Sequence, residues 1–152
     1  MGIMAIEKIN VRIKKLDERA IIPTYGTENA AGADLYALLD NKTVVNPGET
    51  VKFGTGIALE IPQGLGGFVY ARSGLSCKKG LAPANKVGVI DSDYRGEIFV
   101  FLHNHSDAPV IVANGDRIAQ LVIAPYYYAS FEEVDSLEET KRSDGGFGST
   151  GR

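Results

Sequence analysis

Apolar and polar residues alternate along much of this chain, in runs that are too short for helices. From Ile9 to Lys14 every second residue is apolar, and a similar alternation runs from Val51 to Ile61. Successive side chains of a β-strand point to opposite faces of the sheet, so a period of two indicates a strand with one buried face. The pattern therefore predicts half-buried strands in these two segments.

Further short strands are predicted where β-branched and aromatic residues cluster, in the runs GGFVYAR, GEIFVFLHN, PVIVAN and RIAQLVIAP. Ile98 to Leu102 is almost continuously apolar, as expected for a strand that is covered on both faces. Turn-forming residues recur between the runs, and Asn46 to Glu49 (NPGE) is a strong turn signal. Many short strands joined by turns are typical of an all-β sandwich, barrel or jelly roll.

The only helical candidate runs from Ser73 to Lys79, with a serine near its start, lysines at its end and Gly80 as a stop. We therefore expect an all-β fold, a jelly-roll β-barrel or sandwich with one short helix. From Glu132 the composition becomes acidic and then glycine-rich. This shift predicts a β-domain over residues 1–131 and a mobile C-terminal arm over residues 132–152.

Composition narrows the classes of function. The net charge of −3 argues against a nucleic-acid binder, and the N-terminal segment has no long apolar run that would indicate a signal peptide or a membrane span. The single cysteine, Cys77, excludes an internal disulfide and is expected to be buried or inert. One cysteine and two histidines offer few ligands for a catalytic zinc. We expect a soluble, cytoplasmic protein.

Two segments have residues suited to anion chemistry. In Ala30 to Leu35 (AAGADL) small residues allow close backbone approach, and Asp34 either caps a turn or faces a metal–phosphate group. In Arg72 to Leu75 (RSGL) an arginine and a serine stand at the start of the expected helix, where backbone N–H groups favour phosphate. Ser73 would also serve as a simple helix cap.

Two later segments combine apolar strands with polar residues. Asn85 to Glu97 (NKVGVIDSDYRGE) is predicted to form a β-hairpin with a polar tip, whose backbone is suited to recognising a planar base. Asp91 stands at the end of its first apolar run, either as a turn cap or as a site residue. In Gly115 to Leu121 (GDRIAQL), Gln120 is polar within an apolar strand and either faces water or contacts a ligand.

The tail RSDGGFGSTG begins with Arg142, has Phe147 as its one aromatic residue and is too glycine-rich to pack as an element. Arg72, Arg142, the tail and the helix start together form a set of anion-binding groups. Asp91 and Asp34 would then supply what phosphate chemistry needs, a base and a partner for a metal-bound water.

In this order, the five segments resemble the motifs of the all-β, trimeric deoxyuridine triphosphatase (dUTPase) family, from AAGADL to RSDGGFGSTG. The resemblance implies a jelly-roll homotrimer with active sites shared between subunits. It also implies hydrolysis of dUTP to dUMP and pyrophosphate with Mg²⁺, which lowers dUTP and supplies the precursor of dTTP.

The resemblance further implies a role for each matching residue. Asp91 would be the general base that activates water for attack on the α-phosphorus, and Tyr94 would pack under the deoxyribose and leave no room for a 2′-hydroxyl. Asp34 would hold a water on the metal. Uracil would be held by Asn85, Gly88, Val89, Ile90 and the backbone of Asp91, and the phosphates by Arg72, Ser73, Gly74 and Gln120.

In the tail, the resemblance implies that Arg142 reaches the γ-phosphate and Phe147 stacks on uracil, while Gly148, Ser149 and Thr150 close over the phosphates. Ser143 departs from the family, in which glycine commonly follows this arginine, and with Asp144 it is expected to slow closure of the tail.

Two alternatives to this function stay open. One is a related dCTP deaminase, which would need a glutamate near the base and would lack this tail. The other is a nucleotide-gated signalling or binding protein.

Overall fold

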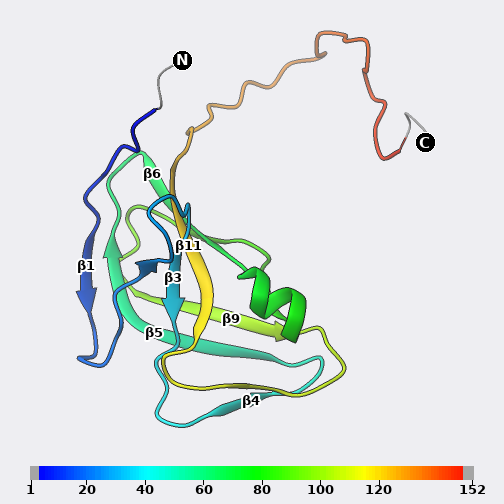
Figure 1. Cartoon of the computed structure of the whole chain (residues 1–152). Coiled ribbons are helices and arrows are strands. Elements are labelled where there is room, and N and C mark those ends of the chain that lie inside the picture. The colour runs from blue at the N-terminus through cyan, green and yellow to red at the C-terminus, as the bar shows by residue number, and fades with distance from the viewer. Residues whose placement is uncertain (1–3, 149–152) are drawn as a thin grey trace.

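The chain folds into antiparallel β-sheets with one short helix, as Figure 1 shows for the computed structural model, which describes residues 4–148. One sheet has the strand order β1-β5-β9-β7, a second has the order β2-β3-β11-β6-β8, and β10 pairs with β4. The expected all-β jelly roll with one short helix is confirmed. The strands are β1 (Arg12–Lys15), β2 (Thr24–Tyr25), β3 (Ala33–Tyr36), β4 (Thr43–Val45), β5 (Thr50–Glu60), β6 (Leu65–Tyr70), β7 (Leu81–Pro83), β8 (Gly88–Ile90), β9 (Glu97–Asn104), β10 (Val110–Val112) and β11 (Arg117–Pro125).

The helix η1 (Leu75–Lys79) is a π-helix and ends at Gly80, whose φ of 79° is the left-handed conformation expected of a stop signal. Within the described residues no side chain caps its start by a hydrogen bond, so the expected cap by Ser73 is not formed. Cys77 lies exposed on this helix. Of the expectation that it is buried or inert, the first alternative is wrong, and the second stays a prediction.

The alternation of apolar residues predicted β5 well and β1 only in part. In β5, Phe53, Ile57 and Leu59 are buried in the core, as the period of two requires. β1 begins only at Arg12, and the preceding Ile9 is exposed. β1 is shorter than predicted because its partner β5 ends at Glu60, so that the pairing extends no further than the pair of Arg12 with Glu60.

The predicted hairpin between residues 85 and 97 is wrong. β8 pairs with β6 in one sheet, whereas β9 pairs with β5 and β7 in the other. The segment between them, from Asp91 to Gly96, crosses from one sheet to the other. Such a crossing lets both strands turn an apolar face into the shared core, where Ile90 and Ile98 are both buried.

β9 also departs from the expectation that both of its faces are covered. Ile98, Val100 and Leu102 are buried, but Phe99 and Phe101 are 38% and 46% exposed. The outer face of β9 is therefore apolar and open within a single chain. Large aromatic side chains on an open sheet face are typical of surfaces that pack against another chain.

A polar group at the centre of the fold is fully satisfied. Asn104 is completely buried, and its Nδ2 donates to the carbonyl oxygens of Val45 and Ala108, both at 2.8 Å. Its Oδ1 accepts from the backbone N–H and the hydroxyl of Ser106 at 2.9 and 2.7 Å. The amide thus ties β4 and β9 to the turn that precedes β10.

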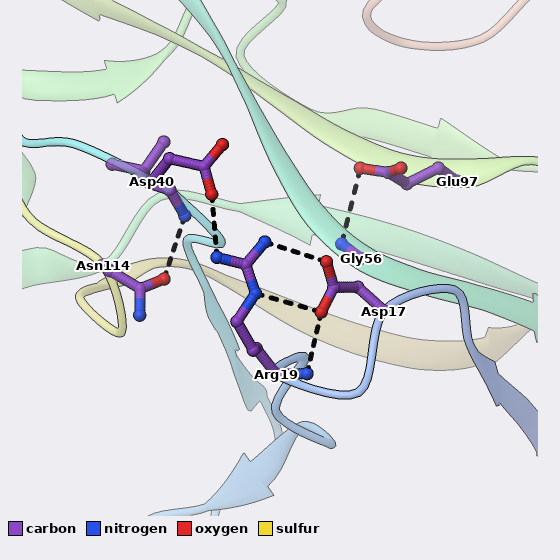
Figure 2. Close-up of polar contacts among 7 residues, drawn as sticks. Asp17, Arg19, Asp40, Gly56, Glu97 and Asn114 are labelled. Atoms are coloured by element: carbon purple, nitrogen blue, oxygen red, sulfur yellow. Dashed lines mark hydrogen bonds and ion pairs between the residues drawn. The ribbon is translucent and has the colours of Figure 1, made fainter.

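An exposed ion-pair network fixes the loop between β1 and β2 (Figure 2). Arg19 donates to both carboxylate oxygens of Asp17, and its Nη1 lies 2.8 Å from Asp40 Oδ1. The guanidinium lowers the pKa of Asp17 to about 2, chiefly through the side-chain hydrogen bonds. Asp40 follows β3, so Arg19 connects two loops that are distant in sequence.

After β11 the chain leaves the sheets and runs outward as an arm (Figure 1). Tyr127, Tyr128, Phe131 and Leu137 along this arm are each more than four-fifths exposed. An extended arm with exposed aromatic side chains buries little of its own surface, which leaves it free to lie on another molecule. None of the helices among residues 4–148 is long and apolar enough to cross a membrane.

Replacing Asn104 with alanine is expected to lower the free energy of unfolding by about 3 kcal/mol, because it leaves buried carbonyl groups without a donor. Denaturant unfolding at one fixed protein concentration measures the change. Asn41→Ala, at an exposed position, is the matched control. A change below about 0.5 kcal/mol for Asn104→Ala would contradict the assigned role.

Candidate active site

The position of β11 between β3 and β6 brings three of the sequence segments together. Gln120 on β11 lies opposite Asp34 on β3 and opposite Tyr70, the last residue of β6. The Gln120 amide donates to the carbonyl oxygen of Ala71 at 2.9 Å. The reading that Gln120 simply faces water is therefore not favoured, because its amide fixes the backbone just before Arg72; contact with a ligand stays a prediction.

Asp34 lies between two arginines. Its Oδ1 accepts from Arg72 Nε at 2.9 Å, and its Oδ2 lies 3.8 Å from Arg117 Nη1. Only 14% of the Asp34 side chain is exposed, so this charge is largely removed from water. Arg72 Nη1 also donates to the carbonyl oxygen of Arg117 at 3.4 Å. The carboxylate therefore orients two guanidinium groups at the edge of one groove.

That groove is suited to an anion. Three cationic side chains line it, together with one carboxylate, that of Asp116, which accepts from the Ala113 N–H at 2.8 Å. The full lining is Arg72, Gly74, Leu75, Lys79, Val112, Asp116, Arg117 and Ile118. Ser73 is exposed beside it. Guanidinium groups with fixed orientation favour the oxygens of a phosphate. Arg117 was not assigned to the site from the sequence, because an arginine at the start of a strand is common. The feature that could have identified it is its position in the same segment as Asp116 and Gln120.

The residues expected to hold a base line a second cavity. Asn85, Gly88, Val89, Ile90, Asp91 and Tyr94 all contribute to it, together with Phe99 and Phe101 of β9, which the sequence did not assign to the site. A β-carbon built at Gly88 would lie 3.3 Å from Asn85 Nδ2, so glycine lets the Asn85 amide approach the strand. A flat cavity with one amide and exposed strand backbone is suited to a planar heterocycle.

Asp91, at one end of the cavity, lies far from the groove within one chain. Ile90 pairs with Gly67 near the start of β6, whereas Arg72 follows Tyr70 at the end of that strand. At a strand rise of about 3.3 Å per residue, Asp91 and Arg72 are separated by roughly 20 Å. A carboxylate that activates water must lie within hydrogen-bond reach of it, so the Asp91 and Arg72 of one chain do not serve the same reacting phosphorus.

The tail residues lie away from both regions in this chain (Figure 1). Arg142 Nε donates to the carbonyl oxygen of Gly145 at 2.6 Å, and Phe147 is fully exposed. Gly148 has a φ of 87°, a conformation that favours glycine. Ser149 and Thr150 lie outside the described residues.

Ser143 adopts a φ of 44°, which explains why glycine would suit this position. Two hydrogen bonds hold the serine there: its N–H donates to Thr140 Oγ1 at 3.0 Å and its hydroxyl donates to the Thr140 carbonyl at 2.9 Å. The left-handed conformation costs a non-glycine residue about 1 kcal/mol. These bonds offset that cost, so the turn forms with serine at this position.

Comparison with known proteins gives consistent results. A family model described as dUTPase matches residues 18–151. A deoxyuridine 5'-triphosphate nucleotidohydrolase of Desulfitobacterium hafniense is 51% identical over 145 residues, covering 95% of this chain and 96% of that protein. The protein of that name from the Wolbachia of Brugia malayi is 47% identical, with both chains covered completely.

Solved structures resemble the chain in the same way. A mutant dUTPase of Staphylococcus bacteriophage 80alpha with dUpNHpp has a TM-score of 0.85 at 26% identity, over 94% of this chain and 99% of that one. A mutant dUTPase from phage phi11 of S. aureus has a TM-score of 0.75 at 26% identity, over 86% of this chain and all of that one. The second is described as revealing the coordination of a structural Mg(II) ion.

Gly32 leaves space for the Gln120 side chain, because a β-carbon built there would lie 3.0 Å from Gln120 Cδ and closer still to Oε1. Gly32→Ala is therefore expected to displace the amide from the Ala71 carbonyl and to weaken binding of inorganic triphosphate about fivefold to tenfold. Calorimetric titration measures the affinity. Gln120→Ala should weaken binding to a similar extent, and the two changes should not add; full additivity would contradict the contact.

Proposed function

The chain belongs to the dUTPase family and hydrolyses dUTP, and we propose how its residues carry out this reaction. The products are dUMP and pyrophosphate, so the enzyme is a dUTP diphosphatase. The observation that supports the assignment of roles is the grouping of the expected base-binding residues around one cavity and of Arg72 and Gly74 around one groove.

We propose that Asp91 is the general base. It is exposed at the rim of the base cavity, where the carbonyl of Asp91 accepts from the Tyr94 N–H at 3.1 Å. The carboxylate would take a proton from the water that attacks the α-phosphorus. As the water oxygen bonds to this phosphorus, the bond from the phosphorus to the oxygen that bridges it to the β-phosphorus would break, and pyrophosphate would leave.

On the phosphate side, Arg72, Ser73, Gly74 and Gln120 would contact the triphosphate, and the arm would supply Arg142 and Phe147. The pair of Arg72 with Asp34 supports this role, because a guanidinium that is already oriented loses little freedom when an anion binds. Fixed positive groups then stabilise the charge that develops on the leaving pyrophosphate.

The residues present fit a magnesium ion that arrives with the substrate. No group of three His, Cys, Asp or Glu that could hold a metal occurs among residues 4–148. Mg²⁺ prefers oxygen ligands, keeps several waters and is often held by substrate phosphates, so one carboxylate is sufficient. We propose that Asp34 holds one of these waters. The ion would neutralise charge on the triphosphate when bound.

We also propose that the enzyme is a homotrimer whose active sites are shared. The distance between Asp91 and Arg72 within one chain supports this, since the two would meet only across chains. The open aromatic face of β9 and the extended arm supply apolar surface for such an assembly. The arm would then order over a site on a neighbouring subunit, as a lid does.

The deaminase alternative is not supported. Glu97 lines the base cavity, but its carboxylate points to β5, where Oε2 accepts weakly from the Gly56 N–H at 3.4 Å (Figure 2). A β-carbon built at Gly54 would lie 3.6 Å from Glu97 Cδ, so the carboxylate occupies a recess on β5. Its orientation toward β5 argues against a role on the base.

A panel of nucleoside triphosphates with Mg²⁺, scored for pyrophosphate release, tests the function, and hydrolysis is expected for dUTP alone. Asp91→Asn should lower kcat for dUTP by roughly 10²–10⁴-fold and retain nucleotide binding, because only the proton acceptor is lost. Asp93→Asn, at an exposed position in the same loop, is the control and should keep its activity. Wild-type turnover by Asp91→Asn would show that another group is the base.

A further inference from the structure

The side chain of Tyr94 occupies the space that a side chain at Gly96 would need. A β-carbon built on Gly96 would lie 2.6 Å from Tyr94 Cζ and 3.0 Å from Cε1, and closer still to the hydroxyl oxygen. Real β-carbons do not approach other atoms to 2.6 Å. The aromatic ring therefore folds back over the backbone of its own loop, and this position tolerates no side chain while the ring stays there.

Backbone conformation does not explain this glycine. The glycines that adopt a positive φ among the described residues are Gly48, Gly56, Gly64, Gly80, Gly115 and Gly148, and Gly96 is not one of them. An L-residue at position 96 could adopt the same backbone angles. The remaining reason for glycine is the close approach of the Tyr94 ring.

The ring is fixed at its far end as well. The Tyr94 hydroxyl donates to the carbonyl oxygen of Glu97 at 2.8 Å. That carbonyl belongs to the first residue of β9, and the side chain of the same glutamate lies against β5 (Figure 2). A loop side chain is thereby tied to a sheet at one end, while its ring rests on the glycine.

Tyr94 nevertheless keeps an open surface. It is 43% exposed and lines the base cavity together with Asn85 and Asp91. A ring that is held in place and open on one side is a rigid platform. A sugar joined to a base in this cavity, with its α-phosphate near Asp91, would lie against it.

From these contacts we infer that Gly96 is a specificity-determining positioning residue, which holds the Tyr94 ring where it excludes the 2′-hydroxyl of a ribonucleotide. This inference rests on the proposed function, because it assigns part of the sugar selectivity of the same site. Gly96 does not touch the substrate and acts only through the ring. Steric exclusion of a hydroxyl requires a rigid surface, because a side chain that can move aside leaves room for one extra oxygen atom.

The test is Gly96→Ala, assayed with dUTP and UTP. The added methyl group must displace the ring from its position, and an exposed ring has room to move. We expect the ratio of kcat/KM for dUTP to that for UTP to fall at least tenfold, mainly through increased hydrolysis of UTP. Gly26→Ala is the matched control, because a β-carbon there meets nothing within 4 Å among the described residues. It should leave the ratio unchanged.

A double-variant cycle separates an effect through Tyr94 from a general structural effect. Tyr94→Ala should lower the ratio by itself, and Gly96→Ala added to it should change neither the ratio nor the melting temperature further. If Gly96→Ala alone unfolds, the double variant should fold, because the clash has been removed. A wild-type ratio in Gly96→Ala, full additivity in the cycle, or a double variant as unstable as Gly96→Ala would each overturn the inference.

These outcomes are distinct from failure of the proposed function. If the wild-type enzyme did not hydrolyse dUTP, the proposed function itself would fail. The wild-type enzyme could instead hydrolyse dUTP and not UTP, while Tyr94→Ala and Gly96→Ala keep this preference. In that case only the inferred role of Tyr94 and Gly96 in sugar selectivity would be wrong.

Discussion

The pairing of β6 with β8 on one side and β11 on the other is the constraint on which the site depends. It places Gln120 beside the end of β6, and it places Gly88, Val89 and Ile90 opposite the middle residues of that strand, from Val69 to Gly67. The pairing of β11 with β3 adds Asp34 opposite Gln120. Because side chains alternate with a period of two, a slip of one residue in any of these registers would turn the polar residues away from the site.

The same registers separate two of the proposed reacting groups. The Asp91 and Arg72 of one chain stand at opposite ends of β6, so the Asp91 carboxylate is out of hydrogen-bond reach of water at a phosphate that Arg72 holds. This separation supports the proposed sharing of sites between chains. The apolar face of β9 and the extended arm present surface that the chain itself does not bury, and this surface would be available for such an assembly.

Sequence patterns predicted the features that depend on local chemistry. The alternation in β5, the turn at Asn46 to Glu49 and the stop at Gly80 follow from periodicity and from residues that favour particular backbone angles. The supposed hairpin failed because two apolar runs separated by a polar loop pair with each other only if they lie in the same sheet, and nothing local decides that. Phe99 and Phe101 were misread for a related reason, because apolar side chains in a core and at an interface look alike in sequence.

Site residues that belong to a sequence motif could be predicted. Residues whose role depends on contacts between distant segments could not. Asp34 and Gln120 could be named from their unusual surroundings in sequence, whereas Asn85 was named only through the resemblance to a family. Arg117 could not, because its role follows from its distance to Asp34 in space. Gly96 could not be named either, because a glycine beside a turn indicates only the turn. The structure shows that the Tyr94 ring fills the space that a side chain at position 96 would need.

The central claim is that Asp91 and Arg72 of different chains form one active site. The most direct measurement mixes two inactive variants, Asp91→Asn and Arg72→Ala, in equal amounts under conditions that exchange subunits, and records dUTP hydrolysis. Sites assembled from different chains should recover about a quarter of the wild-type activity, because random mixing pairs one intact Asp91 with one intact Arg72 in that share of sites. Activity that stays at the level of the separate variants, after subunit exchange has been verified, would contradict the account.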